Sequence, residues 1–97
     1  MPKDYHVVRK DGNHTEVLDT FRKLGATVID CAPLKNAFDL LVIHKGKYYI
    51  VEVKDGKKPP SQRKLTSGEI ECREKVESAG GEYHVILSVD EAVELLR

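Results

Sequence analysis

Two runs of strand-forming residues separated by a tight turn constrain the fold more than any other feature of this chain. Residues 38–43 (Phe-Asp-Leu-Leu-Val-Ile) and 48–54 (Tyr-Tyr-Ile-Val-Glu-Val-Lys) are rich in aromatic and β-branched side chains, and a Lys-Gly-Lys turn lies between them. The pattern predicts a β-hairpin. Side chains two residues apart share one face of a strand, so Glu52 and Lys54 are expected to point to the same side, opposite the valines that alternate with them.

The remaining segments predict helices and strands on both sides of that hairpin. The first helix is expected between residues 13 and 25, with Val17, Phe21 and Leu24 as its buried stripe. The predicted order is this helix, a strand at 27–31, the two hairpin strands, a helix at 66–79, a strand at 83–89 and a last helix through residue 96. That order predicts an α/β fold, α-β-β-β-α-β-α, with a mixed four-stranded sheet flanked by helices.

Three segments have the composition of a capping box, in which a polar residue starts a helix and a glutamate follows three positions later. They are 13–16 (Asn to Glu), 66–69 (Thr to Glu) and 88–91 (Ser to Glu). A short extended piece is expected at 5–9. The segment 55–65, which contains one glycine and two prolines, is expected to lack regular structure.

Length and composition describe one ordinary globular domain, residues 1–97. Hydrophobic residues make up 40 % of the chain and charged residues 33 %. No apolar run approaches the roughly 20 residues that cross a bilayer, and the first residues do not resemble a secretory signal. The two cysteines, Cys31 and Cys72, lack CxxC spacing, which favours reduced thiols in a cytoplasmic compartment.

Charge is unevenly distributed although the formal net charge is zero. Residues 44–64 contain seven Lys or Arg and two acidic residues, whereas residues 65–97 contain three basic and eight acidic residues. A basic segment of this kind suits an edge that faces phosphate. A lysine-rich solvated loop is the alternative.

The hairpin also carries charges where the surrounding residues indicate burial. Asp39 lies in the first strand segment, and Glu52 and Lys54 lie in the second. Burying an unpaired carboxylate is costly unless it is paired or binds a metal. Two carboxylates and a nearby lysine suit Mg²⁺ or Mn²⁺, with the lysine assisting an attacking water. A cross-strand ion pair on a solvated face is the alternative.

The spacing Asp39, twelve residues, then Glu52-Val-Lys54 resembles the D…ExK signature of the PD-(D/E)XK nucleases, and the resemblance covers residues 9–96. The chain is particularly similar to small stand-alone VRR-NUC-like proteins of phages and prophages, and more distantly to Holliday-junction resolvases. The segments that carry this similarity are 13–16, 38–42, 45–47, 51–60, 63–66 with Glu69, and 88–92.

This resemblance implies a restriction-endonuclease-like core and a metal-dependent DNA endonuclease. It implies that Asp39, Glu52 and the main-chain carbonyl of Val53 bind Mg²⁺ or Mn²⁺, and that Lys54 is the catalytic lysine. Glu16 matches a further acidic residue near the metal, or it is only the partner of Asn13 in a capping box. Relatives of this layout commonly act as homodimers on DNA in bacterial or phage-infected cells.

The sequence departs from the family pattern at two positions. Phe38 replaces the proline that normally precedes the first acid, which removes no ligand. Glu69 stands where many VRR-NUC domains have a glutamine, and Gln62 is a poor substitute by position. The role of that glutamine is therefore in doubt in this chain.

Other polar and aromatic side chains have simpler expected roles. Contacts to the DNA backbone are expected from four basic residues downstream of the hairpin: Lys57, Lys58, Arg63 and Lys64. The four histidines show no metal-ligand spacing and are expected to be surface or satisfied residues, although His14 could approach the site; the tyrosines at 48, 49 and 83 fit strand packing.

A non-catalytic nucleic-acid-binding module on the same fold is the main alternative function, and a small adaptor that keeps only the scaffold is a third.

Overall fold

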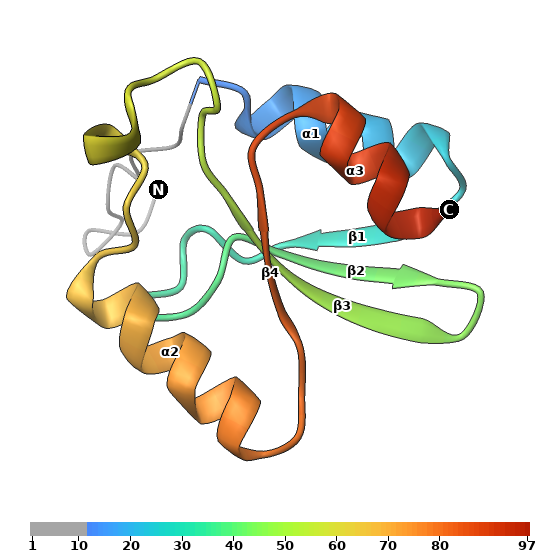
Figure 1. Ribbon diagram of the computed structural model, residues 1–97. Coiled ribbons are helices and arrows are strands. Elements are labelled where there is room, and N and C mark those ends of the chain that lie inside the picture. Colours follow the sequence, from blue (N-terminus) through green and yellow to red (C-terminus); the bar gives the residue numbers. More distant parts are fainter. Residues whose placement is uncertain (1–11) are drawn as a thin grey trace, which may run out of the picture.

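The computed structural model describes residues 12–97, so the extended piece expected at 5–9 lies outside the described residues. Its elements follow the expected order, helix, three strands, helix, strand, helix (Figure 1). They are α1 (His14–Lys23), β1 (Thr27–Asp30), β2 (Leu40–His44), β3 (Lys47–Val53), the 3-10 turn η1 (Pro60–Gln62), α2 (Ser67–Ser78), β4 (Tyr83–Ile86) and α3 (Val89–Leu96). The expectation that 55–65 lacks regular structure is wrong only for the single turn η1.

The four strands form one mixed sheet in the order β1-β2-β3-β4. The first three strands are antiparallel neighbours, and β4 pairs in parallel with β3. The predicted hairpin is confirmed, with His44 opposite Lys47. Its two turn residues, Lys45 and Gly46, have φ values of 50° and 78°, the left-handed backbone that a tight two-residue hairpin turn requires.

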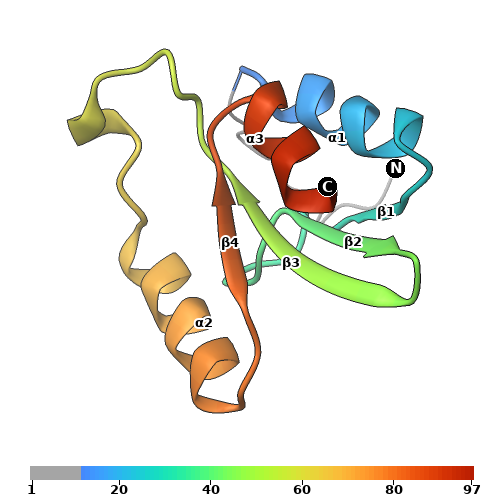
Figure 2. The same ribbon diagram turned by 45° about the vertical axis from the view of Figure 1, so that its right-hand side comes forward.

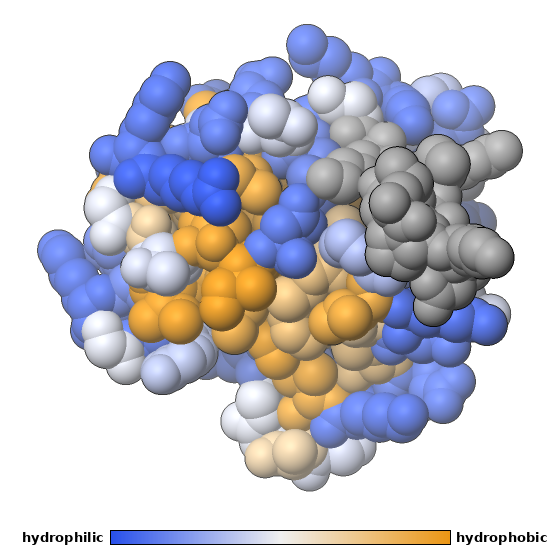
Figure 3. Space-filling model, turned by 180° about the vertical axis from the view of Figure 1, so that it is seen from behind, coloured by the Kyte–Doolittle hydropathy of each residue, from blue (hydrophilic) through white to orange (hydrophobic). Residues whose placement is uncertain are grey.

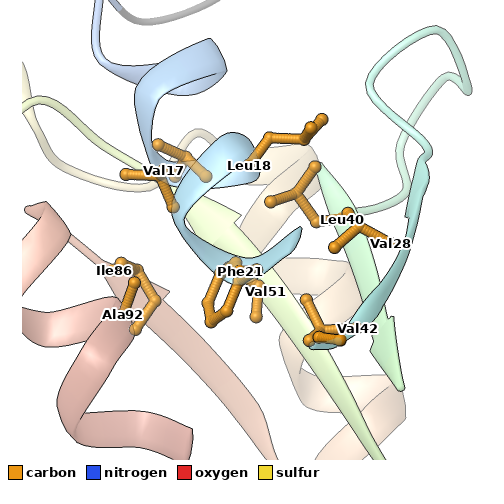
Figure 4. Close-up of a cluster of buried hydrophobic side chains, with 11 residues drawn as sticks. Val17, Leu18, Phe21, Val28, Leu40, Val42, Val51, Ile86 and Ala92 are labelled. Atoms are coloured by element: carbon orange, nitrogen blue, oxygen red, sulfur yellow. The ribbon is translucent and has the colours of Figure 1, made fainter. Parts of the chain in front are cut away.

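Helices lie on both sides of the sheet. Figures 1 and 2 show α1 and α3 side by side over one face, with α2 on the other side beside β4. The main core lies under α1 and α3, where Phe21 of α1 points toward the sheet (Figure 4). Its buried members are Val17, Leu18, Phe21, Ala26, Val28, Leu40, Val42, Val51, Val53, Ile86 and Ala92.

The face of the sheet opposite α1 and α3 is less completely covered. α2 buries none of its own residues, and Ile29 of β1 and Tyr48 of β3 are exposed. Seen from behind, the molecule shows an apolar patch between hydrophilic margins (Figure 3). Leu24, expected in the buried stripe of α1, is 39 % exposed because the helix ends before it. Leu18, which has helical spacing with the same residues in the sequence, lies in the core.

The start of α1 differs from the expected capping box. Asn13 occupies the N-cap position, but its side chain makes no capping hydrogen bond. Its amide nitrogen instead donates to the main-chain carbonyls of Lys54 and Leu87, both at 3.1 Å. Asn13 therefore joins α1 to the ends of β3 and β4, and the capping-box role expected for Glu16 is wrong.

The two other expected caps behave differently from each other. At α2, Thr66 and Glu69 form a complete capping box, with both reciprocal hydrogen bonds present. At α3, the Ser88 hydroxyl accepts from the Glu91 amide, but the Glu91 carboxylate accepts from the Leu87 amide, one residue before the cap. The α3 cap is therefore only partly as expected.

Replacing Asn13 by Asp should destabilise the domain, because the new carboxylate has no N–H to donate and lies against two carbonyl oxygens. The expected loss is about 1–3 kcal/mol in the free energy of unfolding, measured by urea denaturation. Asp is as good an N-cap as Asn, so a capping role for residue 13 would give almost no change. Asn36→Asp makes the same atomic change at an exposed loop position and should stay within about 0.5 kcal/mol of wild type.

Candidate functional site

The structure brings the acidic and basic residues of the hairpin together at the end of β3. Asp39 lies just before β2, where its amide donates to the carbonyl of Val51 at 3.1 Å and continues the strand pairing. Its carboxylate oxygen Oδ2 accepts the main-chain N–H of Val53 at 2.8 Å. This bond crosses from one hairpin strand to the other and fixes the Asp39 carboxylate beside the Glu52-Val-Lys54 segment.

Alternation along β3 separates its apolar and charged side chains. Val51 and Val53 are fully buried in the core under α1 and α3. Glu52 points to the other face and is only 3 % exposed, and Lys54, just beyond the strand, is 8 % exposed. The alternative of a solvated face is therefore wrong for these two charges.

Lys54 forms an ion pair, although the carboxylate closest to it within residues 12–97 is not in the hairpin. Its ammonium nitrogen Nζ lies 2.8 Å from Oε1 of Glu69, in the first turn of α2, and 3.9 Å from Oε2 of Glu52. The same Oε1 accepts the main-chain N–H of Thr66 at 2.8 Å. One carboxylate oxygen thus completes the cap of α2 and holds the lysine.

Glu52 is surrounded by groups that disfavour its ionisation. Burial raises its pKa most, and hydrogen bonding to Glu69 and the negative charge of Asp39 raise it further, to about 10. A carboxyl group with this pKa holds a proton at neutral pH, which lets it act as a donor between neighbouring carboxylates. Among residues 12–97, the cluster contains the carboxyl groups of Asp39, Glu52 and Glu69 and the ammonium of Lys54, and this excess of acidic groups makes the place attractive to a cation.

Glu69 has the opposite shift. Burial alone would raise its pKa, but hydrogen bonds to Glu52, Lys54 and the Thr66 amide outweigh that effect and lower it. Glu69 is therefore the ionised member beside Lys54. Sequence reasoning left its role open, and the only signals were the capping-box pattern and the difference from the family's glutamine.

Tyr83 is a further member of the cluster that sequence reasoning assigned only to strand packing. It is 9 % exposed at the start of β4, and its hydroxyl donates to Oε1 of Glu52 at 3.4 Å. Burial and the nearby charge of Glu52 raise the pKa of this phenol. No sequence signal identifies it, because its contact depends on the parallel pairing of β4 with β3.

Glu16 lies elsewhere among the described residues. It is exposed in the first turn of α1 and lines a cavity of about 550 Å³ beyond the strand ends, together with Asp55, Lys57 and Arg63. The structure gives it no contact with Asp39 or Glu52 within residues 12–97. Its expected place near a metal stays a prediction that this geometry does not support.

The donor set suits a small divalent cation only in part. Within residues 12–97, no group of three or more His, Cys, Asp or Glu side chains has the arrangement of a metal site. Mg²⁺, however, usually binds through one or two carboxylates and completes its shell with water and substrate phosphate. Asp39 and Glu52 together with the carbonyl of Val53 fit that sparse type of site, and the proton on Glu52 would leave when a cation binds.

The basic residues downstream of β3 are distributed over the loop that contains η1. Lys57, Lys58 and Lys64 are exposed, as an approach by DNA requires, whereas Arg63 is half-buried and lines the cavity with Glu16.

The surface expectation for the histidines is wrong for His14. It is 2 % exposed, and its Nε2 lies 3.4 Å from Asp30 on the α1 side of β1.

Comparison with known proteins adds no support to the resemblance that the D…ExK spacing suggests. No family model matches the chain, and no curated protein or solved structure is significantly similar to it.

None of the helices in residues 12–97 is long and apolar enough to cross a membrane.

The pKa of Glu52 generates a prediction on stability in the presence of a metal chelator. The folded protein holds a proton on Glu52 that the unfolded chain releases above its ordinary pKa of 4.5, so this group makes stability fall as the pH rises from there to about 10. Glu52→Gln cannot ionise and its amide can still donate to neighbouring carboxylates, so the free energy of unfolding should depend less on pH between 5 and 9. Glu71→Gln removes an exposed carboxylate of α2 as a control. Parallel wild-type and Glu52→Gln profiles would contradict the raised pKa.

Proposed function

We propose that this protein is a Mg²⁺- or Mn²⁺-dependent deoxyribonuclease with a restriction-endonuclease-like core. The observation that carries the proposal is the buried cluster at the end of β3, where Glu52 is 3 % exposed and the Asp39 carboxylate is fixed by the Val53 amide. Burying Glu52 beside two further carboxylates costs stability, and such clusters of perturbed carboxyl groups are typical of functional sites. The D…ExK resemblance and the order of helices and strands support the same function.

Each residue of the cluster has a proposed role. Asp39, Glu52 and the carbonyl of Val53 would hold the metal ion, which when bound activates water and stabilises negative charge on the phosphoryl group. Lys54 would place a positive charge beside the attacked phosphate and orient the attacking water by hydrogen bonding. Glu16 is outside the proposed metal set because it lies in the neighbouring cavity.

The loop after β3 supports DNA as the substrate. Lys57, Lys58 and Lys64 are exposed within ten residues of Lys54, so their charges lie on the chain segment that leaves the site. Contacts of this kind bind phosphates and carry no sequence information. We therefore propose recognition of the DNA backbone, with no base-specific reading.

A non-catalytic nucleic-acid-binding module on the same fold is the second candidate. The ion pair of Lys54 with Glu69, and the absence of a three-residue metal cluster within residues 12–97, fit a protein that binds DNA without cleaving it. The exposed lysines of the loop favour this module over the adaptor. Such a module would bind DNA through the same basic loop. It would not need a cation, and its binding would be indifferent to Asp39→Asn.

The decisive experiment incubates the purified protein with linear, nicked, flap and junction DNA in the presence of Mg²⁺ or Mn²⁺. Wild type should cleave at least one substrate, with no cleavage in chelator. Asp39→Asn and Glu52→Gln should lose cleavage and Mn²⁺ binding in calorimetry while remaining folded, and Lys54→Ala should lose cleavage but still bind DNA. Binding without cleavage of any substrate, with Mn²⁺ uptake equal in all variants, would support the binding module instead.

The basic loop generates a separate prediction on salt dependence. Changing Lys57, Lys58 and Lys64 together to Gln should weaken duplex binding and reduce the slope of log K against log salt by about 0.9 for each phosphate that the loop no longer neutralises. The matched control changes three other exposed lysines, Lys23, Lys45 and Lys47, to Gln. Equal slopes for the two triple variants would show that the loop is only a solvated surface.

A further inference from the structure

We propose that Glu69 is a positioning residue that holds the ammonium of Lys54 away from Glu52, so that the seating of α2 sets the geometry of the site. This inference rests on the proposed nuclease function. It begins from two distances: the Lys54 ammonium nitrogen lies 2.8 Å from Glu69 and 3.9 Å from Glu52. The lysine thus lies closer to the helix carboxylate than to the carboxylate proposed to bind metal, with which it makes only the longer ion pair.

The second step is the rigidity of the Glu69 carboxylate. Its Oε1 accepts the Thr66 amide, and its own amide donates to the Thr66 hydroxyl at 3.2 Å. These reciprocal bonds fix the first turn of α2 and with it the oxygen that faces Lys54. A lysine side chain has four flexible bonds, so a fixed, charged acceptor is needed to give its ammonium a single position.

The third step concerns what the lysine would do without this partner. Of the acidic groups that the structure describes, Glu52 and Asp39 come next, because Glu52 Oε2 lies 3.9 Å from the Lys54 ammonium and Asp39 contributes negative charge to the same place. An ammonium that moved toward them would neutralise the charge that attracts the metal ion. Glu69 therefore has two effects, which are placing the lysine and preventing it from competing with the cation.

The fourth step is the light packing of α2. The helix buries none of its own residues, so apolar contacts hold it less firmly than α1. The bond between Glu69 and Lys54 is a direct polar link from this helix to the end of β3. Movement of α2 would therefore be transmitted to the lysine.

A double-mutant cycle tests the proposal through metal binding. Glu69→Gln keeps the oxygen that caps α2 but removes the charge that attracts Lys54, so Mn²⁺ affinity should fall, and the cleavage rate should fall on the order of 100-fold with the Michaelis constant for DNA little changed. In a Lys54→Ala background, Glu69→Gln should have almost no further effect on Mn²⁺ affinity. An equal loss of affinity in both backgrounds would show that Glu69 acts through its own charge, which overturns the proposal.

A readout independent of cleavage follows the ammonium directly. In chelator, nitrogen-detected NMR of the lysine side chains should show a slowly exchanging Lys54 ammonium in wild type, Ser88→Ala and Glu71→Gln, and its loss in Glu69→Gln. Ser88→Ala removes the hydroxyl that caps α3, so it controls for reduced stability, and Glu71→Gln controls for charge on α2. An unchanged Lys54 signal in Glu69→Gln would overturn the positioning role. If wild type cleaves no DNA, the nuclease proposal fails, while the NMR comparison still decides whether Glu69 holds Lys54.

Discussion

The coverage of β3 on both faces is the constraint on which the rest of the structure depends. On one face Val51 and Val53 lie in the core under α1 and α3, and on the other Glu52 is almost as deeply buried. A buried carboxyl group in such a place must be protonated, hydrogen-bonded or balanced by a cation. The surrounding contacts from Asp39, Glu69 and Tyr83 follow from that requirement, and each comes from a different element.

Much of the fold could be predicted because local and periodic signals agree. The hairpin follows from two strand-forming runs and a Lys-Gly turn whose residues adopt positive φ, and the order of the elements follows from caps and apolar spacing. Leu24 shows where periodicity fails, because its spacing continues the buried stripe after the helix has ended. Asn13 shows another failure, since a polar residue before a helix has the same pattern whether it caps the helix or bonds to distant strands.

The sequence predicts only those site residues that belong to the β2–β3 hairpin or adjoin it. Glu52 and Lys54 are two residues apart, and Asp39 directly precedes the strand that pairs with β3, so alternation and pairing place them together. Tyr83 enters the site from β4, whose position depends on its parallel pairing with β3. Glu69 enters from α2, a helix that has no buried residue of its own to fix its position. Glu16 is a different case, because a position in the first turn of α1 does not determine which end of which strand it faces, and the structure places it at the neighbouring cavity.

The bonds of Asn13 have a consequence for the order in which the chain can be completed. Its amide binds carbonyls 41 and 74 residues further along the sequence, so α1 acquires its final anchor only after β3 and β4 are both in place. On a ribosome, these partners are made long after the helix itself. Helix α1 is therefore the first element synthesised among those described, and its anchor is complete only when β4 has joined the sheet, which makes folding of the C-terminal third a condition for a fully anchored α1.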